Sequence, residues 1–167
     1  GVKMKDMITP DYSTLTFLAT PNVTKIVKTT EGPSASMNNA EIANKYITFG
    51  VNTDGTPMLD ENGKYITEFN GCHYIKEGKT ELGEGSINEG TEVIQHGDKY
   101  YLTFSPLGYG SRKYAVRQAV GDSPLGPFEK LGKDYNPVMG VNETNDYMAG
   151  TGHHSFIKAG DELFILY

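Results

Sequence analysis

The sequence contains no tryptophan, one cysteine and no long run of apolar residues. With Cys72 alone, no disulfide can form within the chain, so cysteine usage does not indicate a redox compartment. No stretch approaches the roughly 20 apolar residues of a membrane span. The first residues, Gly1-Val-Lys-Met, lack the basic and then apolar pattern of a secretory signal, so any signal would already have been removed.

Positive charge is scarce as well. Lys and Arg together number 15 against 21 Asp and Glu, which gives a formal net charge of −6. A chain with this balance and no basic cluster repels phosphate backbones and anionic lipid surfaces. These numbers argue against nucleic acid and membranes as partners, and a neutral ligand such as a sugar fits better.

What the sequence does contain is an aromatic and turn-rich composition. Among its 167 residues are 11 Tyr, 7 Phe, 20 Gly and 8 Pro, and 37% are hydrophobic. This composition is that of a globular chain with a core, and the length suits one domain or part of a larger one. Because Gly and Pro interrupt regular structure so often, we expect short strands and many turns instead of long helices.

Runs of β-branched and aromatic residues, bounded by turn residues, predict an all-β chain. Three turns, at Asn62-Gly63, Gly97-Asp98 and Gly160-Asp161, lie between apolar runs and predict three similar β-hairpins. Their spacing brackets the ~40–50 residues of a four-stranded propeller blade. A short helix is expected at 40–44, and strands are expected at 46–50, 64–69, 91–95, 99–105, 113–120 and 162–167.

One carboxylate stands out by its position. Glu89 lies with Gly90 directly before the predicted strand at 91–95 and its hairpin. A general acid at the mouth of a strand, partly buried, is what glycoside hydrolysis needs to protonate a leaving oxygen. From this segment alone, the better interpretation of Glu89 is as one of many surface carboxylates, and the surrounding motifs have to favour the catalytic one.

Three elements in order resemble glycoside hydrolase family 43. The first is Glu89-Gly-Thr followed by the Tyr100-Tyr-Leu strand, with Thr91 where that family often has Pro. The second is Asp122-Ser-Pro-Leu-Gly-Pro-Phe128, whose Pro and Gly fix turns between two strands. The third is Gly150-Thr-Gly-His-His154. The resemblance implies a five-bladed β-propeller and Glu89 as the general acid of an inverting glycosidase.

The paired histidines carry two further implications of the resemblance. In that family the Gly-x-Gly-His segment projects an imidazole into the propeller axis, which implies that His153 lies near a central calcium ion. His154 is expected to contact substrate. The alternative for either histidine is a buried hydrogen bond without a functional role, and calcium usually takes several oxygen ligands, so one imidazole is a weak signal for metal.

Two other residues complete the predicted site. Asp54 precedes the Asn62-Gly63 hairpin, where the family places a second carboxylate that tunes the acid, although Asp54-Gly55 is equally interpreted as a turn. Tyr109, between glycines, could stack on a sugar ring or cover a loop. Glu31-Gly-Pro spells the acid motif more literally, but no Tyr-Tyr-Leu strand follows it, so it is interpreted as a loop.

We therefore expect residues 1–167 to form part of a single catalytic β-propeller domain, truncated to about three blades, with the rest of the propeller as its partner. The expected substrate is a plant-type or other polysaccharide or oligosaccharide containing arabinose, xylose or galactose. No convincing general base is present, so the base is expected outside this chain. The alternative is a non-catalytic carbohydrate-binding or structural fragment. A secreted or periplasmic location is expected, with a cytoplasmic one as the alternative.

Overall fold

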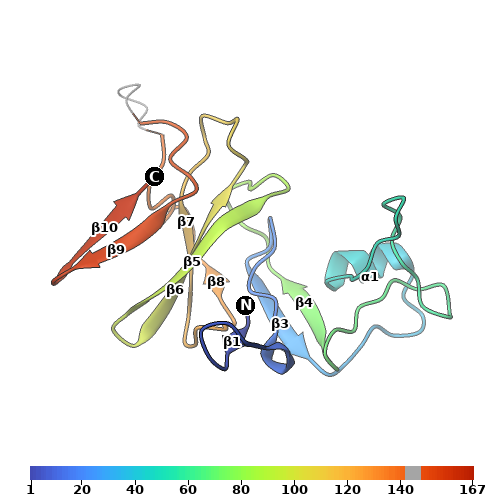
Figure 1. Ribbon diagram of the computed structural model, residues 1–167. Helices are drawn as coiled ribbons and strands as arrows, with labels where there is room; N and C mark the ends of the chain where they lie inside the picture. The colour runs from blue at the N-terminus through green and yellow to red at the C-terminus, as the bar shows by residue number, and fades with distance from the viewer. Residues whose placement is uncertain (142–147) are drawn as a thin grey trace.

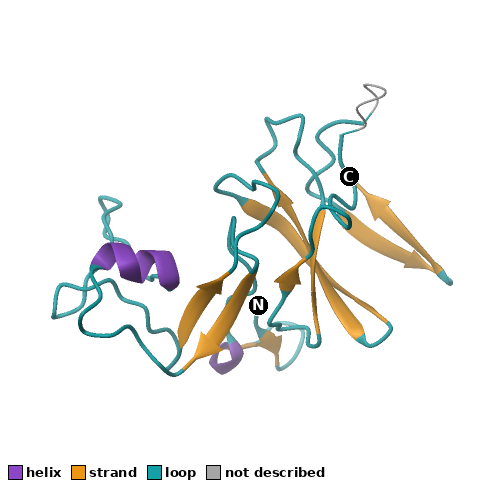
Figure 2. Cartoon of the chain, turned by 180° about the vertical axis from the view of Figure 1, so that it is seen from behind, coloured by secondary structure: helices purple, strands orange, loops and turns teal. Residues whose placement is uncertain are grey.

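The computed structural model describes residues 1–141 and 148–167 and shows an all-β chain in which every strand pair is antiparallel (Figures 1 and 2). This confirms the predicted fold class. Regular helix is confined, among the described residues, to α1 (Asn39–Lys45) and the short 3-10 turn η1 (Tyr12–Thr14). The strands are β1 (Lys3–Met4), β2 (Pro10–Asp11), β3 (Lys25–Thr29), β4 (His73–Glu77), β5 (Asn88–His96), β6 (Lys99–Pro106), β7 (Arg117–Gly121), β8 (Glu129–Lys130), β9 (Ser155–Ala159) and β10 (Glu162–Leu166).

The main sheet has six strands in the order β4-β3-β8-β7-β6-β5. Strands β5 to β8 follow one another as a four-stranded antiparallel meander, the arrangement of a propeller blade. The antiparallel pair of β3 and β4 extends this meander through a single residue pair, Lys25 of β3 with Glu129 of β8. The number of blades in the complete protein stays a prediction.

One hydrophobic cluster holds the meander together. Leu102 and Phe104 lie two residues apart on β6, so their side chains share a face of the sheet, where they pack with Ala119 and Phe128. Phe128 closes the Ser-Pro-Leu-Gly-Pro-Phe turn between β7 and β8, as the sequence predicted for that motif. The motif therefore anchors the turn to the core through its last residue.

A second hydrophobic cluster packs against the antiparallel pair of β3 and β4, on the side of helix α1. Ile26, Ile47 and Tyr74 are buried there, and Phe17 packs edge-on against the Tyr74 ring with centroids 5.3 Å apart. Cys72 packs against the same cluster as a partly buried thiol. Local sequence explains α1, because the Asn38 side chain and Glu41 form a reciprocal capping box at its first turn.

A buried charge cluster connects β7 and β8 to the loop before β5. The Glu84 carboxylate is 1% exposed and accepts a hydrogen bond from the Lys130 ammonium and one from the Asn22 backbone N–H. The Arg117 guanidinium lies 3.9 Å from the same carboxylate. Burial lowers the pKa of Lys130, and Glu84 opposes this shift. A charge removed from water in this way depends on its partners, so the cluster fixes the loop to the sheet.

Some predicted strands are correct and others are not. The hairpins at 91–105 and 155–166 form, and α1 covers the expected short helix. The third predicted hairpin, at Asn62-Gly63, is wrong: the turn there is flanked only by the isolated bridge of Leu59 with Tyr65. Residues 46–50 and 64–69 are not strands: they make only isolated bridges such as Tyr46 with Ile75. Strand β7 begins at Arg117, four residues after the predicted start. Strands β3 and β4 were missed.

The hairpin of β9 and β10 forms a separate two-stranded sheet. It lies at the opposite end of the molecule from α1 (Figure 1). Several of its apolar side chains are exposed, among them Leu163, Phe164 and Leu166. Within the described residues, no helix has both the length and the apolar character needed to cross a membrane.

Candidate active site

Glu89 lies near the start of β5, at a β-bulge. Glu89 pairs with Ser105 and Glu92 with Thr103, so β5 uses one residue more than β6 between these pairs. The extra residue follows from Gly90, whose φ of 56° belongs to the left-handed region that other residues avoid. A bulge of this type changes the direction of the neighbouring side chains. The Glu-Gly dipeptide therefore sets the orientation of the carboxylate.

The half-buried Glu89 side chain lines an open groove of about 550 Å³. The groove floor and rim come from Ile87 and from the loop 107–111 after β6. Tyr109 is part of this loop and is 90% exposed. The structure therefore brings Glu89 and Tyr109 to the same groove, and the open side of the groove gives a ligand access to both.

Two hydrogen bonds lie beside the Glu89 carboxylate. The Tyr114 hydroxyl donates to Glu89 Oε1 over 2.8 Å. The Ser105 hydroxyl accepts from the backbone N–H of His153 over 2.8 Å. Ser105 also tends to lower the Tyr114 pKa. Burial is the largest of the effects on Tyr114 and, together with the Glu89 carboxylate, it raises the pKa of this phenol.

Two glycines allow these parts to approach one another. A Cβ atom at Gly90 would lie 3.1 Å from the His153 Cα, and one at Gly152 would lie 2.5 Å from the Tyr114 ring. The first distance is tight and the second is impossible without movement of the ring. The Gly150-Thr-Gly-His segment therefore packs directly against the Glu89 hairpin. His153 has a φ of 58° and an exposed side chain, and its backbone forms the contact.

His154 points into the protein and does not line the groove. Its side chain is 6% exposed, and Nε2 lies 2.7 Å from the Thr103 hydroxyl. Because that hydroxyl donates to the Glu92 carbonyl, the His154 Nε2–H is the donor to Thr103. Burial, the largest effect, lowers the His154 pKa. The structure thus shows the buried hydrogen bond that was the alternative to substrate contact for this residue.

Asp54 is not brought to Glu89. It occupies an exposed turn in which its Oδ1 accepts from the Thr56 backbone N–H and from the Thr56 hydroxyl. These hydrogen bonds lower the Asp54 pKa. The turn belongs to the segment between α1 and β4, and Asp54 does not line the groove of Glu89. Asp54 was interpreted either as a turn residue or as a carboxylate that tunes the acid. The structure shows the turn, and the role of Asp54 as a modulator of the acid stays a prediction.

The residues around His153 do not form a metal site by themselves. Within the two described ranges, no group of three or more His, Cys, Asp or Glu side chains is arranged to hold a metal ion. Calcium prefers six to eight oxygen ligands, and the contacts recorded for His153 are to Ser105 and Gly90. The described residues therefore supply no such side-chain cluster near His153, and the calcium ion that the family resemblance implies stays a prediction.

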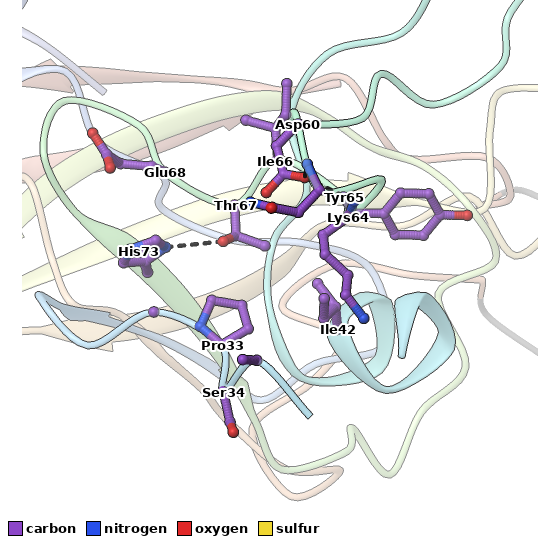
Figure 3. A pocket seen from close by; sticks show the side chains of 13 residues that line it. Pro33, Ser34, Ile42, Asp60, Lys64, Tyr65, Ile66, Thr67, Glu68 and His73 are labelled. Carbon is purple, nitrogen blue, oxygen red and sulfur yellow. Dashed lines mark hydrogen bonds between the residues drawn. The ribbon is translucent and has the colours of Figure 1, made fainter. Parts of the chain in front are cut away.

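A larger hollow, of about 690 Å³, lies between α1 and the segment before β4 (Figure 3). It is lined in part by Gly32 and Pro33 of the Glu-Gly-Pro segment, and the Thr67 hydroxyl and His73 Nδ1 are hydrogen-bonded across it. Two of its charged groups, Asp60 and Lys64, are hydrogen-bonded to backbone groups. Asp60 accepts from two backbone N–H groups of its own turn, and the Lys64 ammonium donates to the Met37 carbonyl. Glu31 itself is exposed in a loop, as predicted.

Sequence reasoning missed Tyr114 and Ser105. Tyr114 belongs to a run that reads as an ordinary strand, and Ser105 ends the Tyr-Tyr-Leu strand without any motif. The available signal was indirect: Ser105 pairs with Glu89 if the hairpin at Gly97 has a bulge at Gly90. Nothing in the sequence links Tyr114 to Glu89, which lies 25 residues earlier.

Comparisons with known proteins agree with the resemblance seen in the motifs. No curated protein matches the sequence significantly. Two solved structures match, both with a TM-score of 0.43: a thermostable family-43 glycoside hydrolase, 38% identical over 47% of this chain, and an endo-1,4-beta-xylanase from Bacteroides thetaiotaomicron, 26% identical over 70% of it. The chain spans 25% and 45% of these two proteins. The sequence model of the glycosyl hydrolases family 43 matches residues 27–167. Because this match covers most of the sequence, the chain belongs to glycosyl hydrolase family 43.

Proposed function

We propose that the complete protein is an inverting glycoside hydrolase in which Glu89 is the general acid. The observation that carries this proposal is the position of Glu89: its half-buried carboxylate lines an open groove and accepts a hydrogen bond from the buried Tyr114. A general acid needs access to the leaving oxygen and a fixed orientation, and this position provides both. Family membership supports the same reaction class.

In this reaction the Glu89 proton moves to the glycosidic oxygen while the bond between that oxygen and the anomeric carbon breaks. A water molecule adds to the opposite face of the sugar, and its proton goes to a carboxylate base. We place that base outside this chain, as the motifs predict, and no other carboxylate among the described residues lines the groove beside Glu89. Asp54 remains proposed as a modulator of the acid on the family resemblance alone.

The proposed substrate is an arabinose-, xylose- or galactose-containing polysaccharide or oligosaccharide. A neutral sugar suits the net charge of −6, which disfavours polyanionic ligands. Tyr109 is proposed to contact the sugar, because an exposed aromatic ring beside the acid offers a flat apolar face and a hydroxyl. A calcium ion near His153, contact of His154 with substrate, and secretion or export to the periplasm stay predictions.

The test is the substitution Glu89→Gln in the complete protein. Gln keeps the shape and the acceptor oxygen but cannot donate the carboxylic proton, so kcat on natural glycosides should fall by about 10²- to 10⁴-fold. Binding of the same oligosaccharide, measured by calorimetry, should change little. The matched control is Glu31→Gln, which alters the more literal Glu-Gly-Pro motif and should leave turnover unchanged.

Turnover like that of the wild type in Glu89→Gln would refute the assignment. Loss in Glu31→Gln instead would move the acid to the other motif. If the complete protein binds sugars but hydrolyses none across a panel of arabinosides, xylosides and galactosides, the non-catalytic carbohydrate-binding alternative is correct.

A further inference from the structure

The hydrogen bond between Tyr114 and Glu89 has one direction. An ionised carboxylate can only accept, so the Tyr114 hydroxyl donates its proton to Glu89 Oε1. The neighbouring Ser105 hydroxyl accepts from the His153 backbone N–H. The Tyr114 proton is therefore directed to the Glu89 carboxylate.

From this geometry we propose that Tyr114 is the positioning residue of the acid. It keeps Glu89 Oε1 as a hydrogen-bond acceptor, so that the proton to be delivered is carried by Oε2, the oxygen that Tyr114 does not contact. This inference rests on the proposed function of Glu89 and assigns the chemistry of the two carboxylate oxygens. Tyr114 acts through Glu89 and does not itself touch the sugar.

Packing keeps this arrangement rigid. Tyr114 is 3% exposed and Ser105 is fully buried, so both side chains are shielded from water. The Gly152 backbone lies against the Tyr114 ring so closely that any side chain there would collide with it. A catalytic group is held in a productive geometry when its supporting residues are locked in this way.

The protonation state of Tyr114 supports the same role. Burial, with Glu89 as a further cause, raises the Tyr114 pKa above its ordinary value near 10. The phenol therefore keeps its proton at neutral pH, and it can donate to Glu89 there. A donor that stays protonated at neutral pH can fix the orientation of the acid.

The experiment compares two leaving groups in the complete protein. Tyr114→Phe removes the hydroxyl and keeps the ring. Its kcat/KM should fall about 10- to 100-fold on natural xylosides or arabinosides, as expected for loss of a hydrogen bond to a charged group. With a 2,4-dinitrophenyl glycoside, whose leaving group departs without protonation, kcat/KM should change less than about twofold.

Tyr135→Phe is the matched control, because it removes one hydroxyl from an exposed tyrosine that does not line the groove, and it should leave both substrates unaffected. Ser105→Ala removes the hydroxyl that accepts from the His153 backbone N–H beside Tyr114, and we expect a smaller loss with the same dependence on the leaving group. This second variant decides the matter if Tyr114→Phe does not fold.

The outcomes separate this inference from the proposed function. If Glu89→Gln keeps turnover of natural glycosides, the proposed function fails. If Glu89→Gln loses that turnover while Tyr114→Phe does not, the inference alone is overturned. Equal losses by Tyr114→Phe on both leaving groups would also overturn it, because they would show a structural role without influence on proton delivery.

Discussion

Two hairpins of this chain have nearly the same turn and very different surroundings. The β5–β6 hairpin turns at Gly97-Asp98 and the β9–β10 hairpin at Gly160-Asp161, and both glycines have φ values just above 60°. In the first hairpin Leu102 and Phe104 are 1% exposed. In the second, Phe164 is 48% exposed. The turn sequence therefore specifies the hairpin but not its burial.

The difference comes from the neighbours of each hairpin. Strand β6 pairs with β7 over five residues and is covered by the core cluster, whereas β9 and β10 pair only with each other among the described residues. The second hairpin is attached to the first through side chains: His154 contacts Thr103, and the Phe156 backbone N–H donates to Glu92. The candidate site lies where these two hairpins meet.

The largest expected effect breaks the buried hairpin. Phe104→Ala should lower the free energy of unfolding by about 3–5 kcal/mol, because it removes a fully buried ring and leaves a cavity. The matched variant Phe164→Ala should cost no more than about 0.5 kcal/mol, since half of that ring is already in water. Urea unfolding of both variants measures the difference.

Similar losses of stability in the two variants would contradict the idea that the two hairpins differ in burial. Both variants should also be measured in the complete protein. A large cost for Phe164→Ala in the complete protein, but not in this chain, would show that residues beyond this chain cover β10.

A smaller effect tests the shared turn. Gly97→Ala and Gly160→Ala each place a Cβ in open space but force Ala into the left-handed region. Both should lose about 1–2 kcal/mol if each hairpin folds with the rest of the chain. Hydrogen exchange of β9 and β10 amides reports the second hairpin separately. A loss confined to those amides in Gly160→Ala, with global unfolding unchanged, would mean that β9–β10 opens independently.

The contact between the hairpins should respond to pH. The His154 pKa is lowered in the folded protein, mainly by burial, so the unfolded chain binds a proton more readily than the folded one. Stability from this residue is therefore complete above about pH 6.5, the ordinary histidine value, and is lost as the pH falls through and below it. Thermal unfolding between pH 7.5 and 5 should show this decline, and His154→Gln should flatten it. A slope unchanged in His154→Gln would assign the decline to other groups.

The smallest effect lies at the exposed end of the β5–β6 hairpin. The Lys99 ammonium contacts the Asp122 carboxylate, and both side chains are substantially exposed. A double-mutant cycle with Lys99→Ala and Asp122→Ala should give only a small coupling energy, weakened further by 1 M salt. A coupling as large as that of a buried ion pair would mean that the pair contributes to the packing of the hairpin end.

The sequence alone determined the features that depend on neighbours in the chain. Both hairpins, the capped helix α1 and the turn that ends at Phe128 follow from turn residues, alternation and capping, which act over a few residues. The family was also readable from short motifs, and the match over residues 27–167 confirms it. The prediction of strands at 46–50 and 64–69 was wrong. Aromatic residues of these segments pack into a core cluster, but their backbones form only isolated bridges and no continuous ladder.

Only the tertiary structure decided what surrounds Glu89. The Tyr114 hydroxyl reaches it from 25 residues away, and the His153 backbone reaches Ser105 across 48 residues. It also placed Asp54 in an exposed turn and His154 in the interior, where sequence left both alternatives open. Such contacts depend on how the strands are arranged in space. They also depend on how closely Gly90 and Gly152 allow the β5–β6 hairpin and the 150–154 segment to approach each other, and no local sequence pattern encodes that approach.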